Sequence, residues 1–306
     1  ENYTRWYSSA ASDVYKRQLA TSLLAACDMW QVKGKIGLAL GGGGAKGLAH
    51  IQMLQVLDEL KLRPHRIAGT SIGAVMGALY ASGMSGQEIE QLVDRLTVSK
   101  DESWWSALFE EDVGRWWDII EIQLGRGGLV DTLGLASFLR EFIPVTQFED
   151  LLIPLKVVAA DFWSRKQVIF DSNNLFPAIQ ASIAIPGVFS PVHYKGQVLV
   201  DGGLVNPLPY DLLFNDCEVV IAIDVLGNRT PVSDEEPSYF ENTFNTFQIM
   251  QASIVREKIK CQPPHIYIRP DLNNIRVLDF HRFEEIYEQA KPAQKKLRRA
   301  LRYYQI

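Results

Sequence analysis

A Gly-x-Ser-x-Gly motif constrains this chain more than any other stretch. The motif spans Gly69–Gly73 with Ser71 at its centre, and it lies between an apolar run and a helix-forming run that begins at Ile72. In this context it predicts a tight strand-to-helix turn that holds the serine oxygen clear of a sheet. The glycines allow backbone to approach backbone, and the start of the following helix favours negative charge. The motif alone also fits a tight turn with a solvated serine, so the choice between these two interpretations depends on other segments of the chain.

A glycine-rich segment predicts a second strand-to-helix junction. The strand candidate at 35–40 runs directly into Gly41–Gly47, and apolar residues at helical spacing follow. The N–H groups at such a junction form an anion site. A P-loop is excluded because Lys46 is followed by Gly47 and Leu48, with no Ser or Thr. A dinucleotide site needs an acidic residue at the end of the second strand, where this chain has Ser71. A transient oxyanion beside a nucleophile is the favoured anion.

Strand and helix candidates alternate along the rest of the 306 residues. The hydrophobic content of 47% and the charged content of 22% are typical of a globular protein. The alternation predicts an α/β fold of three αβα layers, in which a mainly parallel central sheet carries helices on both faces. A net charge of −5 disfavours nucleic acid as a partner. The three cysteines and five histidines show no metal-ligand spacing, so we expect no metal and no cofactor.

Asp201 follows another strand candidate, at 197–200, and begins Asp-Gly-Gly. In open α/β sheets, sites form beyond the carboxyl ends of the strands. The glycine-rich segment and Ser71 are expected at the same place. An isolated Asp-Gly-Gly is ordinarily a turn, but this position favours Asp201 as a partner for Ser71.

These segments resemble the motifs of the bacterial patatin-like phospholipase family. The stretches that carry the resemblance are Gly42–Gly47, Gly69–Gly73, Asp201–Gly203 and the segment Ala181–Pro191. The resemblance implies a serine acyl hydrolase that cleaves fatty acyl esters of phospholipids or lysophospholipids at a membrane or micelle interface. It implies that Ser71 is the nucleophile, that Asp201 is the base, and that an acyl-enzyme forms on Ser71.

The resemblance also implies an oxyanion hole formed by the glycine-rich segment. Its residues are Gly42, Gly43, Gly44, Ala45, Lys46 and Gly47. Lys46 has two interpretations: it attracts a lipid phosphate, or it is a solvated lysine at a helix start.

Two other functions stay open at this point. An α/β-hydrolase-type esterase would use a Ser-Asp-His triad, for which Asp161 and either His193 or His265 are the candidates. A non-catalytic module would use the glycine-rich segment to bind lipid or another anion. His50 follows that segment on a helix candidate, and we expect it to pack beside the site.

The chain is expected to divide into three parts. Residues 35–225 form the patatin-like catalytic core, and 226–306 form a C-terminal helical extension packed on the same domain. Residues 1–34 form an N-terminal segment, in which we interpret Ser8–Gln18 as an artefact of sequence assembly. Leu19–Cys27 resembles the end of a lipoprotein signal or, equally, a frayed helix. We therefore expect a bacterial protein in the cytoplasm or peripherally on a membrane, with a Cys27-anchored envelope location as the alternative.

Two segments are candidates for membrane contact. Four tryptophans lie between 103 and 124 and predict either core packing or an interfacial surface. A helix candidate at 283–304 carries a run of basic residues beside apolar ones at helical spacing. It predicts either a helix that docks on anionic lipid or one that packs on the domain. The basic residues of this run are Lys291, Lys295, Lys296, Arg298, Arg299 and Arg302.

Overall fold

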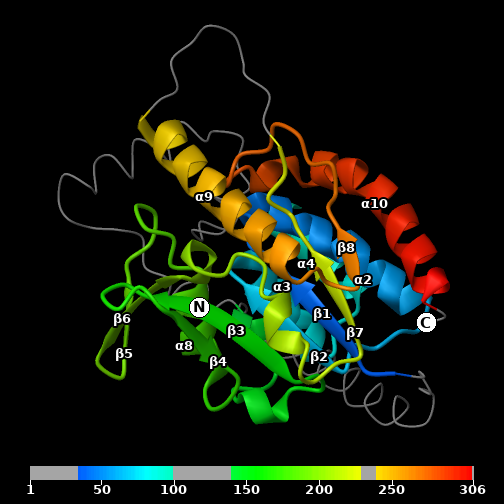
Figure 1. Ribbon diagram of the computed structural model, residues 1–306, viewed down its shortest axis with the longest axis horizontal. Coiled ribbons are helices and arrows are strands. Elements are labelled where there is room, and N and C mark those ends of the chain that lie inside the picture. Colours follow the sequence, from blue (N-terminus) through cyan, green and yellow to red (C-terminus); the bar gives the residue numbers. More distant parts are fainter. Residues whose placement is uncertain (1–33, 99–138, 229–238, 305–306) are drawn as a thin grey trace, which may run out of the picture.

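The computed structural model describes residues 34–98, 139–228 and 239–304 (Figure 1). Its centre is an eight-stranded sheet with the strand order β5-β6-β3-β2-β1-β7-β8, in which β4 also pairs with β3. The strands are β1 (Ile36–Leu40), β2 (Arg66–Thr70), β3 (Leu155–Asp161), β4 (Gln167–Phe170), β5 (Val192–Tyr194), β6 (Gln197–Asp201), β7 (Val219–Ile223) and β8 (Ile266–Ile268).

The sheet combines a parallel centre with an antiparallel edge. The strands β3, β2, β1, β7 and β8 are parallel to one another, whereas β4 and β6 run antiparallel to β3, and β5 runs antiparallel to β6. The central strands are almost entirely apolar, because a parallel strand covered on both faces has no side in water. The mainly parallel sheet expected from the sequence is confirmed.

Helices cover both faces of the sheet. Alternate residues of one strand point to opposite faces, so Leu38 and Leu40 pack in the larger core whereas Ala39 packs in the smaller one. The larger core is built by α2 (Ala49–Glu59), α3 (Ile72–Ala81), α4 (Gly86–Val98), α8 (Leu175–Ser182) and α10 (Phe283–Tyr303). The smaller core is covered by the 3₁₀ turn η4 (Tyr210–Leu213) and by α9 (Tyr239–Cys261). The three-layer αβα architecture is therefore confirmed.

The segment after residue 225 adds β8 to the sheet as well as the two long helices. α10 (red) lies along α2 (blue), as Figure 1 shows. The apolar side of α10 is buried there, with Ile286, Leu297 and Leu301 fully covered. Arg298 also donates two hydrogen bonds to Glu59. The packing interpretation of this helix is confirmed, because its apolar side is not available to a bilayer.

Among the described residues, no helix is long and apolar enough to cross a membrane. The four tryptophans between 103 and 124, Cys27 and the rest of the N-terminal segment lie outside the described residues. The predictions for those segments stay predictions.

Candidate active site

Ser71 occupies a strained turn between β2 and α3. Its backbone has φ 55° and ψ −128°, a combination that costs a non-glycine residue energy and that concentrates at functional sites. The glycines on either side are sterically required. A Cβ at Gly69 would lie 2.5 Å from the carbonyl oxygen of Gly73, and a Cβ at Gly73 would lie 2.1 Å from that of Leu40. The Gly-x-Ser-x-Gly spacing therefore follows from the close approach of the backbone on both sides of the serine.

A buried serine holds this turn in place. The N–H of Ser71 donates to Oγ of Ser182 at 2.8 Å, and Ser182 Oγ donates to the carbonyl oxygen of Val158 at 2.6 Å. Ser182 is fully buried at the end of α8. It lies within the segment Ala181–Pro191 that the sequence analysis singled out, but its role depends on a contact between distant segments.

Asp201 is the hydrogen-bond partner of Ser71, as the sequence predicted. Ser71 Oγ donates to Asp201 Oδ2 at 2.6 Å, and the N–H of Gly203 donates to Asp201 Oδ1 at 2.7 Å. Both side chains of the pair are 5% exposed. One oxygen of the carboxylate is thus fixed by the backbone, and the other faces the serine hydroxyl.

Burial sets the proton affinity of Asp201. Desolvation raises the pKa of its carboxyl from 3.8 to about 6, although the hydrogen bonds from Ser71 and Gly203 act in the opposite direction. A carboxylate with this pKa accepts a proton more readily than a solvated aspartate and is still ionised at pH 7. It is thereby suited to act as a general base.

The glycine-rich segment contributes fewer free donors than expected. The N–H of Gly42 donates to the carbonyl oxygen of Pro207 at 2.9 Å, and the N–H of Ala45 donates to that of Val277 at 2.8 Å. The expectation that these two amides belong to the oxyanion hole is wrong, because carbonyl groups occupy them. The N–H groups of Gly43 and Gly44 have no hydrogen-bond partner among the described residues, and both glycines line the pocket that contains Ser71.

Lys46 and Gly47 have structural roles in the turn that follows. Lys46 is 1% exposed, so the interpretation as a solvated lysine is wrong. It packs beneath Gly227, where a Cβ would come within 2.9 Å of Lys46 Cδ. Gly47 lets this turn pack against the start of α3, because a Cβ there would lie 2.1 Å from a side-chain carbon of Ile72.

His50 supports the glycine-rich segment from below. Its Nε2 lies 2.8 Å from the carbonyl oxygen of Gly41, and the ring is completely buried. Burial lowers the pKa of His50 to about 4, so the ring is neutral near pH 7 and Nε2–H donates to Gly41. The expected packing role beside the site is confirmed.

The histidine-triad candidates do not meet Ser71. His193 is exposed on the edge strand β5, and His265 Nδ1 accepts the N–H of Val220 near the amino end of β7. Both oxygens of Asp161 are engaged, by two backbone N–H groups of a turn and by the side chain of Gln197. Among the described residues there is also no group of three side chains that could hold a metal ion.

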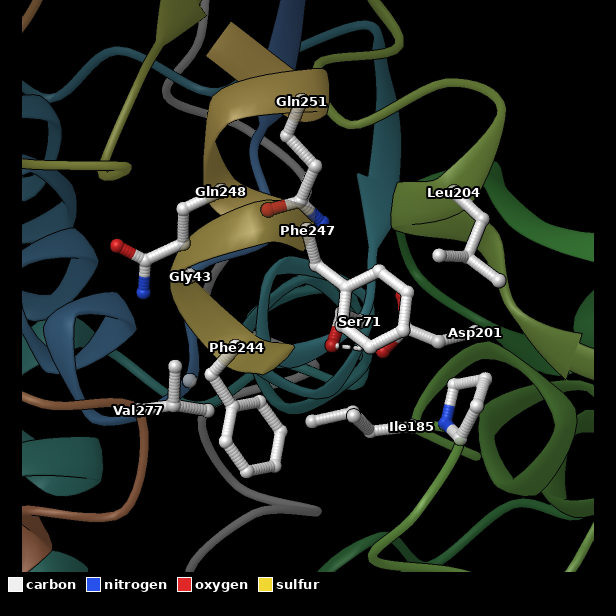
Figure 2. Close-up of a pocket in the computed structure, with 12 residues that line it drawn as sticks. Gly43, Ser71, Ile185, Asp201, Leu204, Phe244, Phe247, Gln248, Gln251 and Val277 are labelled. Atoms are coloured by element: carbon white, nitrogen blue, oxygen red, sulfur yellow. Dashed lines mark hydrogen bonds between the residues drawn. The ribbon is translucent and has the colours of Figure 1, made fainter. Parts of the chain in front are cut away.

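A small, mostly apolar pocket lies over the Ser71–Asp201 pair. Figure 2 shows the ring of Phe247 in front of this pair and the ring of Phe244 to one side of it; both residues belong to α9 and line the pocket. The other residues that line it are Gly43, Gly44, Ile185, Pro186, Leu204, Gln248, Gln251 and Val277. The cavity volume is about 40 Å³, far below the roughly 300 Å³ at which ligand pockets usually begin. No local pattern in the sequence indicates that one side of α9 faces the serine.

The sequence is similar to one protein family model and to several curated proteins. A family model described as patatin-like phospholipase matches residues 38–214. An uncharacterized NTE family protein of Mycobacterium bovis is 32% identical over 206 residues, which make up 67% of this chain and 53% of that protein. Lysophospholipase NTE1 of Kluyveromyces lactis is 30% identical over 276 residues, or 83% of this chain and 18% of that protein. The chain therefore spans about half the length of the mycobacterial relative and a smaller part of the yeast one.

Among solved structures, VipD from Legionella pneumophila aligns with a TM-score of 0.46 at 15% identity, over 87% of this chain and 67% of that chain. The assignment of the chain to a family depends on the sequence comparisons. The family model covers more than half of the 306 residues and includes both Ser71 and Asp201. The chain belongs to the patatin-like phospholipase family.

Proposed function

We propose that this chain is a serine acyl hydrolase that cleaves fatty acyl esters of phospholipids or lysophospholipids. The observation that carries the proposal is the 2.6 Å hydrogen bond from Ser71 Oγ to a buried carboxylate at the base of an apolar pocket. Family membership and the printed name of the yeast relative, a lysophospholipase, support the choice of a lipid ester.

The first half-reaction transfers the acyl group to the serine. Asp201 takes the proton from Ser71 Oγ while that oxygen attacks the ester carbonyl carbon. The negative charge that develops on the carbonyl oxygen is stabilised by the N–H groups of Gly43 and Gly44, for which removal of one donor typically costs about 3–4 kcal/mol of transition-state stabilisation. When the tetrahedral intermediate collapses, Asp201 returns the proton to the leaving alcohol, and the acyl chain stays on Ser71.

The second half-reaction releases the fatty acid. Asp201 is ionised again and takes a proton from a water molecule that attacks the acyl-enzyme. Collapse of the second tetrahedral intermediate returns the proton to Ser71 Oγ. The apolar lining from Ile185, Leu204 and Phe244 suits the acyl chain during both steps.

Labelling with a fluorophosphonate probe tests the nucleophile. The parent chain should become labelled, and Ser71→Ala should not, because the probe forms its covalent bond with an activated serine oxygen. The same pair of proteins should then be compared on a panel of phospholipid, lysophospholipid and neutral ester. Hydrolysis by Ser71→Ala within tenfold of the parent would overturn the assignment. A parent that neither labels nor hydrolyses any lipid would instead support the non-catalytic binding module.

A further inference from the structure

The tip of the β3–β4 hairpin exposes two large aromatic side chains. Phe162 is 49% exposed and Trp163 is 75% exposed, and their rings contact each other edge to face with centroids 5.0 Å apart. Rings of this size usually bury most of their area. Tryptophan in particular is enriched where an apolar phase meets water, because its ring is apolar and its N–H is polar. This exposed pair therefore points to an apolar surface outside the chain.

The backbone holds this tip in a defined conformation. Asp161 Oδ1 accepts the N–H groups of Trp163 and Ser164, each at 2.9 Å. The N–H of Phe162 donates to the carbonyl oxygen of Val198 at 2.8 Å, and that of Arg165 donates to the carbonyl oxygen of Asp161 at 2.9 Å. The aromatic pair is thus presented by an ordered turn, so little conformational entropy is lost when it meets a partner.

Cations surround the aromatic pair. Arg165 and Lys166 follow it after Ser164, and both are exposed. The β5–β6 turn lies alongside, since Asp161 pairs with Leu199 on β6, and this turn exposes Lys195. In the segments 161–168 and 191–200 the only carboxylate is Asp161, whose oxygens accept hydrogen bonds from the tip and from Gln197 on β6. Two aromatic rings flanked by three cations match the apolar layer and the phosphates of an anionic bilayer.

The hairpin tip lies at the edge of the sheet that carries the active site. Ala159 on β3 pairs with Asp201, and Trp163 comes four residues later in the chain. At about 3.3 Å per residue, the tip extends at most roughly 13 Å beyond that pair. β3 is parallel to β2, so the hairpin tip and Ser71 both follow the carboxyl ends of their strands. A surface that meets the tip is thereby brought close to the proposed nucleophile.

We propose that residues 162–166, together with Lys195, form a docking site for an anionic phospholipid bilayer. Phe162 and Trp163 enter the interfacial layer, and the three cations contact lipid phosphates. This inference gives the proposed lipid hydrolase a means of reaching its substrate. The docking itself does not require that Ser71 be reactive.

Vesicle co-sedimentation of the full chain tests the proposal. All proteins carry Ser71→Ala so that no lipid is consumed, and the vesicles are either pure phosphatidylcholine or phosphatidylcholine with 30% phosphatidylserine. The mixed vesicles should bind the chain more tightly, and added salt should weaken the binding. The double change Phe162→Ser and Trp163→Ser should reduce binding at least tenfold. Changing Arg165 and Lys166 to Gln should cost about fivefold for each cation and reduce the salt dependence.

Tyr303→Ser is the matched control. Tyr303 is an aromatic residue that is 83% exposed, but its neighbour Tyr304 donates to the carbonyl oxygen of His265 at the opposite, amino end of the parallel strands. This change should leave vesicle binding as it is. Thermal melts of all variants should coincide, because every altered side chain is exposed.

Binding that is indifferent to both hairpin variants would overturn the proposal. So would a hairpin variant that dissociates a dimer in light scattering while vesicle binding stays the same, because the aromatic pair would then contact a second copy of the chain. The docking proposal and the proposed hydrolase activity can be contradicted independently of each other. A parent chain that binds these vesicles through the hairpin but labels with no fluorophosphonate would retain the docking site and lose the proposed hydrolase activity.

Discussion

Thr70 and Asp201 follow one another along the same edge of β3. Thr70, the last residue of β2, pairs with Val158, and Asp201, the last residue of β6, pairs with the next residue, Ala159. β2 therefore leaves the sheet at the position where β6 arrives from the opposite direction. Ser71 comes next after Thr70, so its hydroxyl meets the Asp201 carboxylate. The pair is positioned by sheet register, which is a more rigid support than two loops would give.

Asp201→Asn should remove activity and should also remove one pH dependence of the unfolding free energy. Asparagine cannot take the proton from Ser71, so hydrolysis should fall by orders of magnitude. The folded-state pKa of Asp201 is about 6 and its ordinary value is 3.8, so the folded state binds the proton more tightly than the unfolded state does. The parent is therefore more stable when this group is protonated, and it loses that contribution as the pH rises from about 4 to 6.

The size of this effect follows from the shift. A difference of about two pKa units corresponds to roughly 3 kcal/mol of unfolding free energy. Asparagine has no charge to bury, and it can accept the Gly203 N–H while its amide group faces Ser71 Oγ. Urea unfolding should show the variant as stable as the parent near pH 4 and more stable by a few kcal/mol at pH 7.5. If the two proteins are equally stable at both pH values, burial does not raise the pKa of Asp201 in the folded state.

Ser182→Ala should lower kcat, although Ser182 takes no part in the reaction itself. The change leaves the N–H of Ser71 and the carbonyl group of Val158 without their buried partner, at a cost of about 1–3 kcal/mol. The turn that holds Ser71 then loses its support, so we expect kcat to fall tenfold or more with a smaller change in KM. The control is Ser82→Ala, since Ser82 is a buried serine whose hydroxyl donates only to Leu79 within the same helical segment. Equal losses of activity in the two variants would contradict the positioning role.

The sequence predicted correctly that Ser71 and Asp201 are partners, but one step of the argument was incomplete. Asp201 was chosen because sites form beyond the carboxyl ends of parallel strands, whereas β6 is antiparallel to β3. The residue still reaches Ser71 because β6 occupies the edge of β3 that β2 has left. A single sequence shows where a strand lies but not its direction, because apolar periodicity is the same for both.

The proposed oxyanion donors show a different limit of what the sequence can predict. Gly42, Gly43 and Gly44 look alike as residues, yet the N–H of Gly42 is occupied by Pro207, a residue far away in the chain. Likewise, no pattern in the sequence indicated that Phe244 and Phe247 of α9 line the pocket over Ser71. Both facts depend on long-range packing, for which no local pattern exists.

Gly44→Ala should slow the chemical step more than it weakens binding. Gly44 has φ 58°, and a Cβ there would lie 2.3 Å from the carbonyl oxygen of Val277, so the loop has to shift. A displaced amide no longer faces the oxyanion, which exists only during the reaction. We therefore expect kcat to fall about a hundredfold while KM changes little.

Gly196→Ala provides the control for this variant. Gly196 has φ 80° but nothing within 4 Å of the added Cβ, so it reports the effect of a left-handed backbone position alone. Both variants should be assayed on a soluble short-chain ester. A Gly44 variant in which only KM rises would indicate that the loop binds a phosphate of the ground-state substrate.

Phe247→Ala should open the site. The pocket of about 40 Å³ is too small to hold a whole acyl chain, and the ring of Phe247 on α9 lies over Ser71. Removal of its ring should raise kcat/KM for a short, soluble p-nitrophenyl ester several-fold, because Ser71 then becomes more accessible to the substrate. Ile249→Ala is the control, since this residue lies on the same helix but is exposed. If neither change alters the rate for short or long esters, α9 does not limit access, and the acyl chain must enter past Ile185 and Leu204 instead.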